Sequence, residues 1–209
     1  MAHFDLHEQE QLSKLGYFWR DWGKYVIGLL VIVIITYLSS VGWNYKSSKD
    51  ASAAALLYAN FIKDAGGNVQ SAYEIADKME QNYPRAEYTA MASIWAAKLA
   101  YSNKDMKRAK TYLNWTIKEA KDQGLVAIAM LRLADVYIDQ KEFDAAVSLL
   151  MQKHDASFDP LFYTKRGDLY VAKGNYAKAR DAYKEALNKA GNDQNMVGSI
   201  QLKLDVLGN

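Results

Sequence analysis

The distribution of apolar and polar residues divides the chain into two parts. The 21 residues from Tyr25 to Tyr45 carry no charge, whereas apolar residues beyond Asp50 recur at the three- and four-residue spacing of amphipathic helices. A helix rises ~1.5 Å per residue, so the uncharged run reaches about 31 Å, close to the ~30 Å hydrocarbon core of a bilayer. The pattern predicts a segment over residues 1–24 that is cytoplasmic or interfacial, a transmembrane helix over 25–45 that contacts lipid, and a helical domain over 46–209.

A cleaved export signal is the alternative to this anchor, because Ser40 and Gly42 form a small-x-small pair. However, 24 residues precede the run, and the run is longer than the 7–15 residues typical of a signal peptide. Three basic residues precede the span and two follow it, which favours a cytoplasmic N-terminus. Gly28, Thr36 and Ser40 share one face of the helix, where they either allow close approach of another transmembrane helix or contact lipid only.

The most regular part of the remaining sequence is "YTKRGDLYVAKGNYAKARDAYKEAL", which begins at Tyr163. Its large and small residues follow the spacing of a tetratricopeptide repeat, with Gly167 and Ala179 small where two antiparallel helices meet. The pattern recurs upstream, and in the first copy it predicts Leu56 and Ala59 as core residues. The repeats are expected near residues 53–86, 90–123, 127–159 and 160–193, followed by a capping helix over 194–207. The predicted fold class is therefore all-α: one N-terminal transmembrane helix, a tetratricopeptide-repeat solenoid and a C-terminal cap.

Charge and residue types argue against catalysis and against binding of nucleic acid. From residue 50 onward, 21 Lys and Arg residues face 20 Asp and Glu residues, so the domain lacks a basic footprint. The chain has no cysteine and no glycine-rich phosphate loop. His3 and His7 are four residues apart but have no obvious further metal ligand, and His154 is expected in a loop. We therefore expect no catalytic residue, metal or cofactor, and no enzymatic activity.

The concave side of the solenoid is the candidate binding surface. In such repeats, positions 2, 5, 9 and 12 of the first helix face the groove, although some of these apolar residues could instead pack against neighbouring helices. The corresponding residues of the last three repeats are Met91, Ile94, Lys98, Tyr101, Ile128, Leu131, Asp135, Ile138, Leu161, Thr164, Asp168 and Val171. They predict an apolar groove with a few charges, without the Lys and Asn clamp of repeats that bind chaperone C-termini.

The layout of the chain resembles a bacterial family. A short N-terminal segment leads through "WGKYVIG" into the anchor, "GWNYK" follows it, and the alanine-rich "ASAAALLYANFI" leads into the repeats. These features are similar to those of the YfgM family of ancillary subunits of the Sec translocon. The resemblance implies an inner-membrane protein with a periplasmic C-terminal domain, partnered by the SecYEG translocon and a chaperone of the PpiD type, that assists handover of translocated proteins. The alternative is an anchored repeat scaffold for envelope assembly or cofactor biogenesis.

Overall fold

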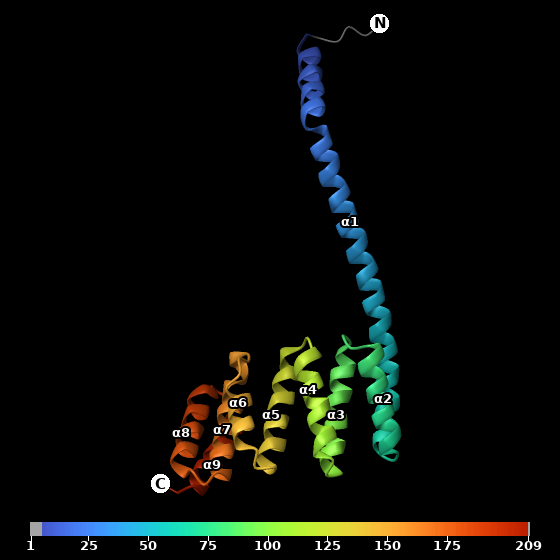
Figure 1. The fold of residues 1–209 in the computed structure, drawn as a ribbon. Coiled ribbons are helices and arrows are strands. Elements are labelled where there is room, and N and C mark those ends of the chain that lie inside the picture. The colour runs from blue at the N-terminus through green and yellow to red at the C-terminus, as the bar shows by residue number, and fades with distance from the viewer. Residues whose placement is uncertain (1–5, 209) are drawn as a thin grey trace. The chain divides into compact units, whose positions relative to one another are not determined.

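The structure is a computed structural model that describes residues 6–208. Over this range every regular element is a helix, which confirms the all-α prediction (Figure 1). The elements are α1 (Leu6–Ala65), α2 (Val69–Asn82), α3 (Glu87–Ser102), α4 (Met106–Glu119), α5 (Gln123–Asp139), α6 (Phe143–Leu150), the 3₁₀ helix η1 (Ala156–Phe158), α7 (Asp159–Ala172), α8 (Tyr176–Lys189) and α9 (Gln194–Val206). The chain forms two compact units, Met1–Lys49 and Asp50–Asn209, and α1 contributes residues to both.

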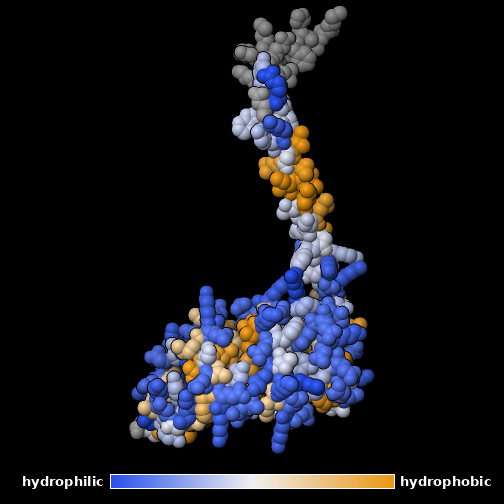
Figure 2. Space-filling view, viewed as in Figure 1, coloured by the Kyte–Doolittle hydropathy of each residue, from blue (hydrophilic) through white to orange (hydrophobic). Residues whose placement is uncertain are grey.

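The first unit contains the apolar segment of α1. Its large apolar side chains from Ile27 to Val41 are exposed, and they form the orange band on α1 in Figure 2. Among the described helices, α1 alone is long and apolar enough to cross a membrane, and its most apolar stretch is wholly unburied. A helix with apolar residues on all sides and no protein cover fits a lipid environment. His3 and the side chain of His7 lie outside the described residues.

Exposed aromatic residues stand at both ends of the apolar segment. Tyr17, Trp19 and Trp22 precede it, and Trp43 and Tyr45 lie at its end. Tyr and Trp side chains combine an apolar ring with a polar tip, and they are enriched where a helix leaves the hydrocarbon for the headgroup region. Their placement here therefore brackets a stretch that matches the thickness of a bilayer.

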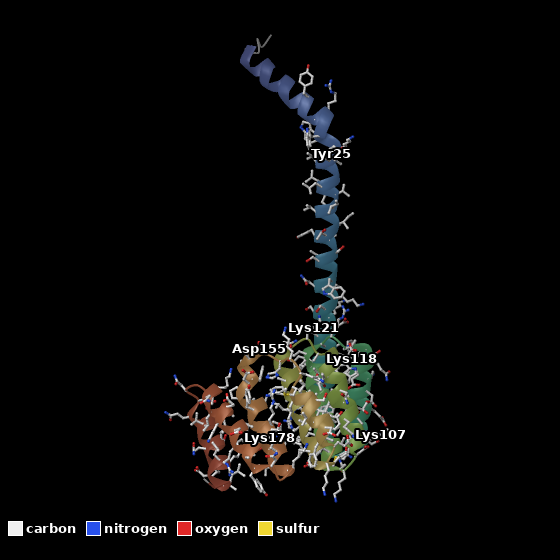
Figure 3. All side chains as sticks on the ribbon, turned by 60° about the vertical axis from the view of Figure 1, so that its left-hand side comes forward. Tyr25, Lys107, Lys118, Lys121, Asp155 and Lys178 are labelled. Carbon is white, nitrogen blue, oxygen red and sulfur yellow. The ribbon has the colours of Figure 1, made fainter. Side chains whose placement is uncertain are left out.

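The second unit is a stack of antiparallel helix pairs. Helix α3 packs against α4, α5 against α6, and α7 against α8, while α5 also contacts α3 and α7. The turns within these three pairs each place one residue in the left-handed region, namely Lys104, Lys141 and Gly174. The connections from α4 to α5 and from α6 to α7 lie at the same end of the unit, as the labels of Lys121 and Asp155 show in Figure 3. Equivalent turns in successive pairs are what a repeat solenoid requires.

Small residues allow the helices of each pair to approach closely. The buried core is rich in alanine, including Ala96, Ala97, Ala100 and Ala109 in the α3–α4 pair. At the C-terminal end Ile200 of α9 is buried, and Val197 and Leu204 pack with it against the cluster around Tyr183 and Ala186. Helix α9 thus covers the last apolar face of the solenoid, as the sequence predicted.

The first repeat differs from the prediction. Leu56 is 67% exposed and Ala59 is also exposed, whereas Ala54 and Phe61 are fully buried. The predicted core positions in this helix are therefore wrong, and its buried face is turned away from them. The buried face carries Ala54, Tyr58 and Phe61, and its two rings lie 6.2 Å apart. Together the two aromatic side chains offer more apolar surface for burial than Leu56 and Ala59 do.

Candidate partner-binding groove

Helices α3, α5 and α7, the first helices of three successive repeats, line two adjoining hollows. The hollow between α3 and α5 has a volume of about 230 Å³ and includes Lys98, Tyr101 and Asp139 in its lining. The second hollow, between α5 and α7, has a volume of about 380 Å³ and also receives Lys203 from α9. Arg132 and Asp135 of α5 line both. We refer to the two hollows together as the groove.

Most of the residues predicted from the repeat register border the groove. Eight of the twelve line one or both hollows: Lys98, Tyr101, Ile128, Leu131, Asp135, Leu161, Thr164 and Asp168. Met91, Ile138 and Val171 are half-buried and line neither hollow. Ile94 is only 7% exposed and belongs to the hydrophobic core, because the small residues around it allow α3 to pack closely on its neighbours. For Ile94 the alternative of packing against neighbouring helices therefore applies.

Arg132 and Lys165 line the groove although the prediction from the sequence did not include them, whereas the equivalent residue of α3, Trp95, lines neither hollow. Trp95, Arg132 and Lys165 occupy equivalent positions in α3, α5 and α7, four residues after position 2 and three before position 9. Residues three and four apart share a helix face, so the register itself could have revealed this row. Trp95 is 42% exposed, although a tryptophan ordinarily buries most of its surface.

Lys165 and Asp135 form an ion pair between successive repeats. The ammonium nitrogen Nζ of Lys165 on α7 donates to Oδ1 of Asp135 on α5 at 2.5 Å, and it lies 3.5 Å from Oδ2 of Asp168. Burial opposes the charged form of Lys165, but the hydrogen bonds and charges of the two carboxylates outweigh it and raise its pKa. Lys165 thus remains charged and ties α5 to α7.

Asp168 joins three helices at the C-terminal end of the groove. Its Oδ1 accepts hydrogen bonds from Nζ of Lys203 on α9 at 2.5 Å and from the hydroxyl of Tyr183 on α8 at 2.8 Å. Burial raises the pKa of Tyr183, and the hydrogen bond to Asp168 adds to this effect. The phenol therefore stays protonated and continues to donate to the carboxylate.

At the other end of the groove, Tyr101 connects α3 with α5. Its hydroxyl donates to Oδ2 of Asp139, and this hydrogen bond, with burial and the negative charges of Asp139 and Asp135, raises the pKa of Tyr101. Each carboxylate in the groove therefore has a donor from another helix. Within the described residues, no cluster of three His, Cys, Asp or Glu side chains is arranged to hold a metal ion.

Comparison with known proteins places this architecture in a family. The family model described as a tetratricopeptide repeat-like domain matches residues 17–209, a range that includes the apolar segment of α1. A protein of Neisseria gonorrhoeae, named as an ancillary SecYEG translocon subunit, is 30% identical over 204 residues, which are 97% of this chain and 98% of the relative. The chain belongs to the family of ancillary SecYEG translocon subunits.

Other members of the ancillary translocon subunit family align over nearly their whole length. A relative from Haemophilus influenzae is 24% identical over 95% of this chain and 98% of its own. A relative from Escherichia coli K12 is 26% identical over 96% of this chain and 97% of its own. Both carry the same name, so the combination of apolar helix and repeat domain matches a family whose members are named for the translocon.

Proposed function

We propose that this protein is a non-catalytic, membrane-anchored scaffold that associates with the Sec translocon and with a periplasmic chaperone, and so assists the handover of translocated proteins. The observation that carries the proposal is the match of the whole chain, anchor and repeats together, to relatives named as ancillary SecYEG translocon subunits. A helical-repeat domain supports the same role, because its stacked helices offer a long concave surface for a partner.

The proposed topology follows from the charge bias around the anchor. Residues 1–24 lie in the cytoplasm or at its membrane surface, residues 25–45 cross the inner membrane once, and residues 46–209 lie in the periplasm. Basic residues near a span remain preferentially on the cytoplasmic side, and the larger number precedes this span. In this arrangement the groove faces the compartment in which translocated chains emerge.

The groove is the proposed docking surface for the protein partner. Ile128 and Leu161 both line the second hollow and are more than a third exposed, and exposed apolar surface grouped in a hollow marks interaction sites. Tyr101 adds an exposed ring with a polar tip, a side chain enriched at the energetic centres of interfaces. In the anchor, the face formed by Gly28, Thr36 and Ser40 is the proposed contact with a partner's transmembrane helix.

Site-specific photocrosslinking in intact membranes tests this function. A photoreactive amino acid replaces Tyr101 in the groove or, as a matched control, Lys107, which lies at the outer edge of the repeat unit (Figure 3). We expect the probe at position 101 to form adducts with translocon or chaperone subunits and the probe at 107 to form none. Adducts confined to envelope-assembly or cofactor-biogenesis proteins would favour the alternative scaffold role and contradict this proposal.

A further inference from the structure

Arg132 stands at the junction of the two hollows and is the cation around which the groove is centred. It lies on α5 and lines both the α3–α5 hollow and the α5–α7 hollow. Its side chain is exposed, and within the described residues it makes neither a hydrogen bond nor an ion pair. A guanidinium has five donors in a planar fork that fits a carboxylate in two-point contact. Arg132 therefore offers an unused recognition group at the centre of the candidate site.

Within the described residues, the carboxylates of the groove are already hydrogen-bonded to other side chains, so Arg132 has no carboxylate to pair with. The hollows are lined by four cations, Lys98, Arg132, Lys165 and Lys203, and by three carboxylates, Asp135, Asp139 and Asp168. All three carboxylates already accept hydrogen bonds, from Lys165, Tyr101 and Lys203. Among the residues that the structure describes, Lys98 has no carboxylate partner either, and its ammonium nitrogen lies 4.6 Å from the centre of the Trp95 ring. The surplus charge available to a ligand is therefore positive.

The surroundings of Arg132 limit the kind of anion that fits. Ile128, Leu131 and Leu161 flank it with apolar surface. With four cations against three carboxylates the lining has a net charge of +1, which matches one negative group better than a ligand of high negative charge such as a nucleic acid. A ligand with one carboxylate next to apolar side chains matches both the surplus charge and the apolar walls.

On the basis of the groove's proposed docking role, we propose that Arg132 binds a single carboxylate of a protein partner, in a segment whose neighbouring apolar side chains contact Ile128, Leu131 and Leu161. The carboxylate belongs to an Asp or Glu side chain or to the partner's C-terminus, and both present the same two oxygens to the guanidinium. Hydrogen bonds in which both groups are charged are about twice as strong as neutral ones, so Arg132 determines which segment is accepted.

The test is a selection of peptides on the full-length protein in detergent micelles. A library of random 12-residue peptides is selected for binding to the wild-type protein and, in parallel, to the Arg132→Gln and Lys107→Gln variants. Selected peptides are then synthesised with a free or an amidated C-terminus, and with each acidic residue replaced by its amide. They are titrated against these three proteins and against a fourth, in which Tyr101 and Leu131 are both changed to Ala. Lys107→Gln removes the same charge from the outer surface of α4 and is the matched control.

We expect the wild-type protein and Lys107→Gln to select peptides with one acidic group among apolar residues. Arg132→Gln should bind them about 10- to 100-fold more weakly, on the scale of a hydrogen bond to a charged group. Replacing the critical acidic residue should weaken binding by a similar factor and make the Arg132→Gln effect disappear, whereas a loss on amidation alone assigns the carboxylate to the C-terminus.

Peptides that need Tyr101 and Leu131 but neither an acidic group nor Arg132 would overturn this inference and leave the groove's docking role intact. If no peptide is selected, or if selected peptides do not need Tyr101 and Leu131, the docking role fails and the inference with it.

Discussion

Gly167 of α7 lies directly against the ring of Tyr183 of α8. A Cβ atom at position 167 would come within 2.1 Å of ring carbon Cε1, far closer than any van der Waals contact. Tyr183 cannot easily move aside, because it is 2% exposed and its hydroxyl donates to Asp168 at 2.8 Å. The distance between the two helices of the last repeat is therefore set by the absence of a side chain on one and by a fixed ring on the other.

Gly167→Ala should destabilise the protein. In an exposed helix this substitution is favourable by about 0.5–1 kcal/mol, but here the methyl group must displace a buried ring, at a cost of about 1–3 kcal/mol. Gly198→Ala is the control, because position 198 is helical and has open space around it, and this variant should gain stability. Thermal unfolding of the full chain, followed by circular dichroism in detergent, measures both; equal effects of the two substitutions would refute the close contact.

Glu80 should make stability decrease as the pH rises. Burial and the nearby charge of Asp77 raise its pKa from 4.5 to about 7, despite the hydrogen bond from Ser93. Between these values the folded protein keeps a proton that the unfolded chain has released, so the free energy of unfolding falls as pH rises through this window and levels off above it.

Glu80→Gln keeps an acceptor for Ser93 and removes the titration. We expect the free energy of unfolding of the variant, relative to that of the wild type, to be about 1 kcal/mol higher at pH 8 than at pH 5. This value is discounted for the partial exposure of the group. Glu74→Gln, on the exposed side of the same helix, should leave the pH dependence unchanged. Denaturant unfolding at the two pH values measures the difference, and a parallel pH profile for wild type and Glu80→Gln would contradict the prediction.

Changing Tyr101 and Leu131 together to Ala should weaken partner binding more than it weakens folding. Truncations at the centre of an interface cost about 2 kcal/mol or more of binding energy, and Tyr101 is 38% exposed in the free protein. Partner affinity by titration and the melting temperature are measured on the same samples. Met151→Ala, an exposed apolar residue outside the groove, should change neither. A collapse of the melting temperature would show that the pair belongs to the core, and two unchanged quantities would place the partner elsewhere.

Replacing Gly28, Thr36 and Ser40 with Leu should preserve membrane insertion and weaken co-purification of membrane partners. The Thr36 hydroxyl already donates to the carbonyl of Ile32 at 2.8 Å, so this face contributes close approach rather than a free donor. Replacing Leu30, Ile34 and Leu38 with Val, on the opposite side of the helix, is the control. Unchanged co-purification of the first variant would mean that this face contacts lipid only.

Alkaline phosphatase fused after Asn209 should be active in a bacterial host, because the enzyme requires the oxidising periplasm. The same reporter fused after Lys24, ahead of the span, should be inactive. A cytoplasmic fluorescent reporter in place of the phosphatase should give the opposite pattern. An inactive fusion at Asn209 with a fluorescent cytoplasmic counterpart would reverse the proposed topology.

The sequence by itself determined the two-part organisation of the protein and most of its repeat register. The length and apolarity of residues 25–45 match the hydrocarbon core of a bilayer. A transmembrane helix can therefore be predicted for this run without knowledge of any tertiary contact. Likewise, the repeat spacing identifies Gly167 and Ala179 as the small residues where two antiparallel helices meet. The capping role of α9 follows from its single apolar face.

The tertiary structure alone decided which of several apolar positions became core and which charges remained free. Phe61 rather than Leu56 is buried in the first repeat because the two faces of that helix compete, and the face with the larger rings removes more apolar surface from water.

The sequence also could not predict which charged groups of the groove are free, because its acidic and basic residues are nearly balanced in number. Only their positions across α3, α5, α7 and α9 show that the carboxylates are all engaged by neighbouring helices and that Arg132 is left without a partner among the described residues. Ion pairs between repeats depend on distances of a few ångströms between side chains far apart in the chain, and one-dimensional spacing does not fix these.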